Sequence, residues 1–177
     1  MGVAVVTGAA GGLGRAIAVR LATDGLAVAA LDVDRTELAA TTDEVSATGG
    51  LVRAFTVDLR DVAATAEVLA GIETDLGPIE VLVNNAAVFP AGPIEEVTPA
   101  VYDDVIAVNQ RAYFFTARAV AGLMRAAGRP GAIVNLLDRP GGKHGGVVDQ
   151  HLDGAQVGLD PGQHLGGGRH VPKVDGE

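Results

Sequence analysis

The residues with the clearest chemical potential form a glycine-rich segment near the N-terminus, Thr-Gly-Ala-Ala-Gly-Gly-Leu-Gly over residues 7–14. An apolar run precedes it and an amphipathic run follows, so we expect it to join a strand to a helix. Gly8 lets the chain turn sharply, Gly12 lets the backbone approach a pyrophosphate without a Cβ in the way, and Gly14 allows close helix packing. Free N–H groups at the helix start would bind the phosphates. The pattern predicts a dinucleotide site, with a purely structural turn as the alternative.

Asp32 ends the second apolar run and bears on the choice of cofactor. A carboxylate at this place accepts hydrogen bonds from both hydroxyls of a ribose and repels a 2′-phosphate. Gly11 and Val33, at the two positions where a cation would serve such a phosphate, are uncharged. The sequence therefore favours NAD over NADP. Arg15 and Arg35 are the nearby cations that keep NADP open as the alternative.

Five apolar runs alternate with helical patterns up to residue 136. Strands are predicted over 3–6, 26–31, 51–57, 81–83 and 132–136, and helices over 13–22, 34–48, 61–76 and 98–127. Asp34, with Glu37 three residues later, predicts a capping box at the second helix. Short, continuously apolar strands between helices indicate a parallel sheet covered on both faces, which is a Rossmann-type doubly wound α/β fold. A ligand in such a fold binds beyond the carboxyl ends of the strands. The polar residues expected along that edge are Thr7, Asp32, Asp58 and Asn85.

Together these motifs resemble the short-chain dehydrogenase/reductase family. The matching pieces are the turn over 7–14, Asp32, Asp58-Leu59, Asn84-Asn85-Ala86-Ala87 and Asn109, in family order and with family-like spacing. The resemblance covers residues 1–136. It implies reversible hydride transfer between a nicotinamide cofactor and a carbonyl or secondary alcohol of a small molecule. It assigns the cofactor contacts to Gly8, Gly12, Leu13, Gly14, Asp32, Val33, Asp58, Leu59, Asn85, Ala86 and Ala87.

The resemblance also implies individual roles. Asp58 would accept a hydrogen bond from the adenine amino group, with Leu59 beside the ring, and a helix N-cap is the alternative for Asp58. Residues 85–87 would pass close to the cofactor ribose, although Ala87 replaces the usual family glycine. Asn109 would open its helix locally and hold a water of the proton relay. The alternative is an asparagine on a solvated helix face.

The rest of the family's catalytic set has no match. The family continues after the fifth strand with a Ser and then a Tyr-x-x-x-Lys, in which the Tyr is the general acid or base. The residues of these types are Ser46 in the second predicted helix, Tyr102 and Tyr113 in the long helix, and Lys143 and Lys173, neither of which follows a Tyr by four. We therefore expect an oxidoreductase by lineage whose catalysis is impaired in this chain. The alternative is a dinucleotide-binding protein without catalysis, and the substrate is not indicated.

The composition changes after Leu136. Residues 1–136 hold 29 Ala and no His or Lys, whereas 137–177 hold one Ala, all four His, both Lys and 11 of the 25 Gly. Such a tail has little to bury, so loop or disorder is expected there and 1–136 is the expected folded domain. All tail residues except the two lysines can use codons that begin with G or C. Our hypothesis is that a shifted reading frame produced this tail and truncated the domain, and natural divergence is the alternative.

The overall composition excludes several functions. With 13 basic and 22 acidic residues, the net charge of −9 argues against nucleic-acid or anionic-membrane partners. The absence of cysteine excludes disulfides, Cys-ligated zinc and a thiol nucleophile. The spacing of the four histidines matches no standard metal site, so no metal is expected. No apolar stretch approaches the roughly 18 residues that span a bilayer, and no leader is recognisable, so a cytoplasmic location is expected.

The long predicted helix has two apolar faces. One face would cover the sheet, and in the family the other joins an interface between subunits. Cover by a further helix is the alternative. A homo-oligomer is therefore expected for the family but doubtful for this chain.

Overall fold

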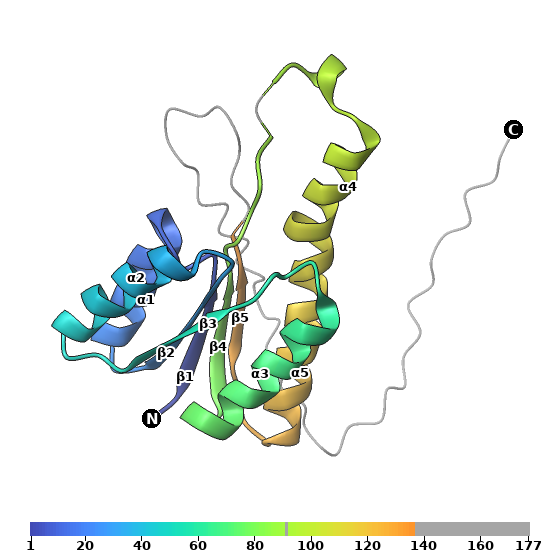
Figure 1. Ribbon diagram of the computed structural model, residues 1–177. Coiled ribbons are helices and arrows are strands. Elements are labelled where there is room, and N and C mark those ends of the chain that lie inside the picture. Colours follow the sequence, from blue (N-terminus) through green and yellow to red (C-terminus); the bar gives the residue numbers. More distant parts are fainter. Residues whose placement is uncertain (91, 137–177) are drawn as a thin grey trace, which may run out of the picture.

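The computed structural model describes residues 1–90 and 92–136, and these form one five-stranded parallel sheet with helices on both faces (Figure 1). The strands are β1 (Val3–Thr7), β2 (Ala27–Asp32), β3 (Val52–Thr56), β4 (Ile79–Asn84) and β5 (Ala132–Asn135). The helices are α1 (Gly12–Thr23), α2 (Arg35–Ala47), α3 (Val62–Leu76), α4 (Pro99–Ile106) and α5 (Tyr113–Ala126). The predicted doubly wound α/β fold is confirmed.

The strand order is β3-β2-β1-β4-β5. The chain begins in the middle of the sheet, adds two strands on one side, and then crosses back to add β4 and β5 on the other side of β1. The order therefore reverses between β1 and β4. In a doubly wound sheet this reversal leaves a crevice beyond the carboxyl ends of the two strands, where a ligand can bind.

Two helix layers bury the sheet. Helices α1 and α2 cover one face, and α3 and α5 cover the other (Figure 1). Residues of β1 alternate between the two layers, because Val3 and Val5 pack in the cluster with Leu69 and Val120, whereas Val6 packs in the cluster with Leu38. Burial on both faces is why β1 and β2 are apolar up to their last residues, Thr7 and Asp32.

The predicted helix starts are largely confirmed, with one difference at α2. The Asp34 side chain accepts hydrogen bonds from the backbone N–H groups of Thr36 and Glu37, and Asp61 likewise accepts from Ala64 at the start of α3. The Glu37 side chain does not complete the predicted capping box. It instead forms an ion pair with Arg15 of α1, with 2.9 Å between Oε2 and Nη2.

The long helix predicted over 98–127 is present from Pro99 to Ala126, but it is not α-helical throughout. A π-helical segment, Ala107–Ala112, separates α4 from α5, and a 3-10 turn, Ile94–Glu96, precedes α4. A π-helical turn widens the helix and often occurs at functional sites. Asn109 lies in the middle of this segment.

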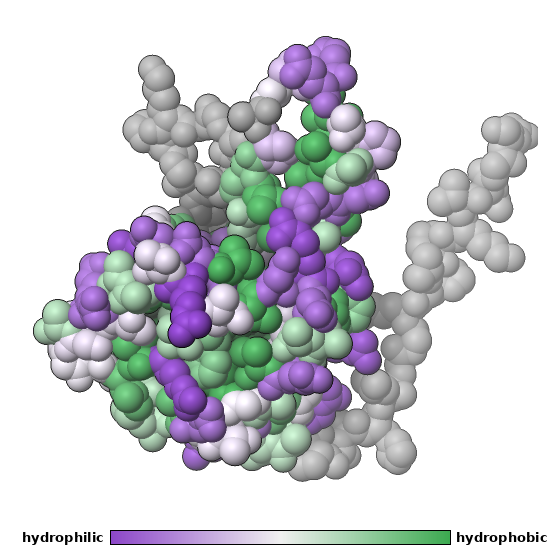
Figure 2. Space-filling view, in the orientation of Figure 1, coloured by the Kyte–Doolittle hydropathy of each residue, from purple (hydrophilic) through white to green (hydrophobic). Residues whose placement is uncertain are grey.

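The outer surfaces are uneven in character. Hydrophilic side chains gather over the 3-10 turn at the top of the view in Figure 2, whereas hydrophobic surface is visible between α2 and α3. All four residues of β5 are exposed, and Phe114 on α5 is 64% exposed.

No helix within the described residues is long and apolar enough to cross a membrane. The predicted tail over 137–177 and its four histidines lie outside the described residues.

Candidate functional site

The parallel sheet brings the ends of its strands to one edge. Thr7 pairs in register with Leu31, Asp32 with Thr56, and Asn84 with Asn135. These paired residues lie at the carboxyl ends of the five strands. Thr7 and Asp32 therefore lie at this edge, as expected, and Asp58 and Asn85 follow the ends of β3 and β4.

The glycine turn joins β1 to α1 in a backbone conformation that requires glycine. Gly8 has φ +65°, and a Cβ there would lie 2.7 Å from the Cα of Ala86. A Cβ on Gly14 would lie 2.0 Å from the backbone oxygen of Gly8. Gly12 differs, because it has φ +52° but a Cβ there would meet no described atom within 4 Å. Gly8 and Gly14 thus allow close packing of the turn, whereas Gly12 faces open space at the start of α1.

A cross-link of four hydrogen bonds holds the turn to the segment after β4. The Thr7 hydroxyl oxygen accepts from the backbone N–H groups of Asn85 at 2.9 Å and Ala86 at 3.1 Å. The Asn85 side chain donates to the backbone oxygens of Thr7 at 3.0 Å and Gly8 at 3.1 Å. The sequence prediction assigned no role to Thr7 beyond its place at a strand end. Its position directly before the glycine turn was the available signal.

The side chain of the neighbouring Asn84 makes its hydrogen bonds on the other side of β4, away from β1. Its Oδ1 accepts from the Thr116 hydroxyl at 2.7 Å, and its Nδ2 donates to Asn135 Oδ1 at 2.9 Å. Asn84 therefore links β4 to α5 and β5, whereas Asn85 links β4 to the glycine turn. The two adjacent asparagines connect both sides of the strand-order reversal.

Asp32 organises the backbone around it. Its Oδ2 accepts from the Ala10 N–H at 3.0 Å, and its Oδ1 accepts from the N–H groups of Val33 at 2.7 Å and Asp34 at 3.1 Å. Two carboxylate oxygens offer about four lone-pair sites, so acceptor capacity remains for a ligand hydroxyl. Val33 is 59% exposed beside it. Asp32 is thus both an anchor of the glycine turn and an open acceptor.

Asp58 and Leu59 follow β3 and have different surroundings. Asp58 Oδ1 accepts from the Arg60 backbone N–H at 2.9 Å and from the Arg60 guanidinium at 3.2 Å. The same guanidinium binds both carboxylate oxygens of Asp104 on α4, and these hydrogen bonds hold the pKa of Asp104 below its usual range. Asp61, and not Asp58, caps α3. Leu59 is only 7% exposed, so most of its side chain is packed in the core.

Asn109 uses its side chain on the backbone of Val88. Asn109 Oδ1 accepts from the Val88 N–H at 2.9 Å, and Asn109 Nδ2 donates to the Val88 oxygen at 3.0 Å. The expected local opening of the helix is present as the π-helical segment. A relay water held by Asn109 stays a prediction.

Of the serine and tyrosine hydroxyls in the described residues, that of Tyr113 reaches the carboxyl edge of the sheet, at Leu136 directly after β5, where it is hydrogen-bonded and buried. Ser46 lies in the last turn of α2, which runs away from the carboxyl edge, as expected. Tyr102 is on α4 and is 59% exposed. The Tyr113 hydroxyl donates to the backbone oxygen of Leu136 at 3.0 Å, and burial raises the pKa of Tyr113 to about 12. A general acid or base works best with a pKa near the operating pH, which Tyr113 does not have.

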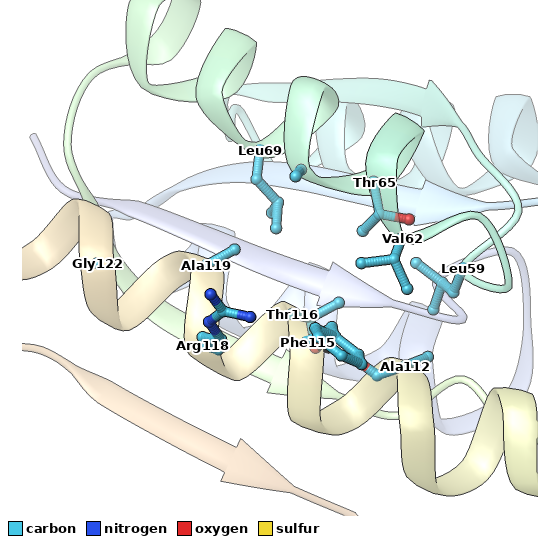
Figure 3. Close-up of a pocket in the computed structure, with 11 residues that line it drawn as sticks. Leu59, Val62, Thr65, Leu69, Ala112, Phe115, Thr116, Arg118, Ala119 and Gly122 are labelled. Carbon is cyan, nitrogen blue, oxygen red and sulfur yellow. Dashed lines mark hydrogen bonds between the residues drawn. The ribbon is translucent and has the colours of Figure 1, made fainter.

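A separate cavity of about 350 Å³ lies between α3 and α5 (Figure 3). Val62 and Leu69 of α3 line it from one side, and Phe115 and Ala119 of α5 line it from the other. Leu59 is the one predicted site residue in its lining, and no residue of the glycine turn takes part. Among the described residues, no group of three or more potential ligands could hold a metal ion.

Comparisons with known proteins agree with this geometry. The family model described as short chain dehydrogenase matches residues 2–146. Galactitol 2-dehydrogenase from Agrobacterium fabrum is 34% identical over 139 residues, which cover 78% of this chain and 53% of that protein. The chain spans about half the length of the curated relatives that it matches in this way.

Two solved structures share the fold. A metagenomic short-chain oxidoreductase in complex with NADP is 40% identical, with a TM-score of 0.73 over 78% of this chain and 62% of that one. Carveol dehydrogenase from Mycobacterium avium in complex with NAD is 29% identical, with a TM-score of 0.73 over 77% of this chain and 54% of that one. One of these relatives was solved with NADP and the other with NAD.

Proposed function

Because the chain belongs to the short-chain dehydrogenase family, we propose that residues 1–136 form a domain that binds a nicotinamide dinucleotide where the strand order reverses between β1 and β4. The observation that carries this proposal is the glycine turn. Gly8 and Gly14 allow the turn to pack closely, while Gly12 leaves open space at the N-terminal end of α1. Backbone N–H groups at a helix start, together with the helix dipole, favour a pyrophosphate.

The remaining contacts follow from the same edge. Asp32 would accept from the ribose hydroxyls, Asp58 would accept from the adenine amino group, and residues 85–87 would pass beside the second ribose. Leu13 and Val33 support the proposal by their exposure at 54% and 59% beside the turn and the strand end. We propose NAD in preference to NADP, because Asp32 would repel a 2′-phosphate.

The proposed activity of the lineage is hydride transfer between this cofactor and a carbonyl or secondary alcohol of a small molecule. For this chain we propose binding with impaired catalysis. An alkoxide that forms during hydride transfer needs a proton donor, and general acid–base catalysis typically contributes about 10²–10⁴-fold. The high pKa of Tyr113 and the absence of a Tyr-x-x-x-Lys support this proposal. A dinucleotide-binding protein without catalysis is the second candidate and shares the same binding site.

Calorimetry with NAD, paired with a dehydrogenase assay, tests both parts. We expect binding with little or no hydride transfer. Gly12→Ala should abolish or strongly weaken binding, because its Cβ would enter the space expected for the phosphates. Gly25→Ala is the matched control, since Gly25 also has a positive φ, +93°, and open space around it, but lies after α1. If wild type binds no dinucleotide, or if both variants weaken binding equally, the proposed site is wrong. Family-level activity would overturn the proposed impairment.

The shifted-frame hypothesis also stays a prediction, because residues 137–177 lie outside the described residues. Sequencing the gene tests it. We expect that restoring the frame near codon 137 yields a Tyr-x-x-x-Lys. A restored frame without that motif would contradict the hypothesis.

A further inference from the structure

Arg15, in the first turn of α1, lies against the glycine turn and is held there by α2. Its Nε donates to the Thr41 hydroxyl at 3.0 Å, and its Nη2 donates to Glu37 Oε2 at 2.9 Å and to the backbone oxygen of Ala10. Glu37 and Thr41 are one turn apart on α2 and therefore share one face of that helix. Thr41 in turn donates to the backbone oxygen of Ala9 at 2.7 Å. The guanidinium is thus fixed at the turn by several independent contacts.

The same guanidinium is linked through Ala10 to Asp32, the residue expected to determine the cofactor preference. The carbonyl of Ala10 accepts from Arg15, while the N–H of Ala10 donates to Asp32 Oδ2 at 3.0 Å. Ala10 therefore bridges the two side chains, with its C=O bound to the Arg15 cation and its N–H bound to the Asp32 carboxylate. Arginine is well suited to bind phosphate. A 2′-phosphate on the ribose at Asp32 would come close to this cation.

Glu37 affects the net charge around the Arg15 guanidinium more than it affects the position of that guanidinium. Thr41 and Ala10 would still hold the guanidinium if Glu37 lost its charge. The Glu37 carboxylate neutralises Arg15 and itself repels a phosphate. Its side chain is 57% exposed, whereas that of Arg15 is 26% exposed, so the cation is the better shielded partner.

We propose that Glu37, through its ion pair with Arg15, is a second specificity-determining residue that disfavours NADP, in addition to Asp32. The inference rests on the proposed dinucleotide site. It accounts for an arginine beside the cofactor turn of a chain whose Asp32 favours NAD. Without Glu37, Arg15 would act as a ligand for the 2′-phosphate.

Glu37→Gln tests the inference, because it keeps the size of the side chain and removes its charge. Dissociation constants for NAD and NADP are measured by calorimetry at low salt. We expect the ratio of the NADP constant to the NAD constant to fall by about threefold or more, which is the upper part of the range for exposed ion pairs. The gain should shrink as salt is added. Asp24→Asn is the matched control, since it breaks the Arg20–Asp24 ion pair, also at 2.9 Å, at the other end of α1. That ratio should not change.

The double variant Glu37→Gln with Arg15→Gln identifies the cation. We expect the gain in NADP binding to disappear in this variant. If the gain persists, another cation such as Arg35 is responsible and the inference is wrong. If wild type binds NAD but the ratio of the NADP and NAD dissociation constants is unchanged in a folded Glu37→Gln variant, only this inference is wrong. Wild type that binds neither dinucleotide overturns the proposed function and this inference with it.

Discussion

Asn109 and Val88 form a reciprocal pair. The Asn109 side-chain amide accepts a hydrogen bond from the Val88 N–H at 2.9 Å and donates one to the Val88 C=O at 3.0 Å. The pair fastens the segment after β4 to the π-helical segment between α4 and α5. The segment after β4 also carries Asn85, which holds the glycine turn. A chain of specific contacts therefore runs from the widened helix to the proposed cofactor turn.

Asn109→Ala should lower the free energy of unfolding by on the order of 1–3 kcal/mol, because it leaves the Val88 N–H and C=O without partners in a partly buried place. Urea unfolding followed by circular dichroism measures the change. Gln110→Ala is the control, since Gln110 is exposed in the same π-helical segment and should change stability by less than about 0.5 kcal/mol. Equal effects of the two substitutions would contradict a specific role for the Asn109–Val88 pair.

Thr7→Val should both destabilise the chain and weaken dinucleotide binding. Valine has nearly the same shape, but it removes the oxygen that accepts from the Asn85 and Ala86 N–H groups, at a cost of about 1–3 kcal/mol. Thr23→Val is the matched control, because the Thr23 hydroxyl only donates to Val19 on the exposed side of α1. Urea unfolding and NAD calorimetry measure both effects. Unchanged NAD affinity in a destabilised Thr7→Val chain would separate the cross-link from binding.

Asp32→Ala should weaken NAD binding and relax the preference for NAD. Each charge-assisted hydrogen bond to a ribose hydroxyl is worth on the order of 1.5–3 kcal/mol at most. Affinities for NAD and NADP are compared in the wild type, in Asp32→Ala and in Asp43→Ala, whose carboxylate is exposed on α2. Melting temperatures control for the loss of the Ala10 contact. Equal affinity of the wild type for the two cofactors would refute the assignment of Asp32.

Tyr113 should make stability depend on pH at the alkaline end. Burial raises the pKa of Tyr113 to about 12 in the folded chain, above the ordinary value of about 10. Between these values the unfolded chain releases the proton and the folded chain keeps it. The contribution of neutral Tyr113 to the free energy of unfolding is therefore complete below about pH 10. It is lost as the pH rises towards about 12, by on the order of 2 kcal/mol.

Urea unfolding at pH 9 and at pH 11.5 measures this dependence. Tyr113→Phe should be less stable than wild type at pH 9, because it loses the hydrogen bond to Leu136, but it should lose less further stability at pH 11.5. Tyr102→Phe is the control, because its ring is 59% exposed, and it should keep the wild-type dependence. The same pH dependence in wild type and Tyr113→Phe would show that the Tyr113 hydroxyl is not held in its neutral form by burial.

Features that depend on neighbours within a few residues could be predicted. The alternation of apolar runs and helical patterns indicated the five strands, and Asp34, Asp61 and Thr98 marked helix starts that the structure confirms. The sharp turn expected at Gly8 is present, and its positive φ angle is one that glycine adopts without strain. The expectation that the long helix opens at Asn109 came from the family resemblance, and the π-helical segment is present there.

Contacts between distant segments could not be predicted, because a polar side chain has several possible partners and packing selects among them. Glu37 suited a capping box with Asp34, but the packing of α1 against α2 brings Arg15 to it instead. The sequence indicated no partner for the Asn85 side chain, and the sheet places Thr7 and Gly8, more than 70 residues earlier, within reach of its amide.

The sequence by itself determined the elements, the glycine turn and the edge of the sheet at which a ligand would bind, because these depend on local backbone preferences and on the direction of parallel strands. Only the tertiary structure decided which polar groups anchor that turn and which remain open to a ligand. The physical reason is that a hydrogen bond forms with the partner that packing brings within about 3 Å, whatever its distance along the chain.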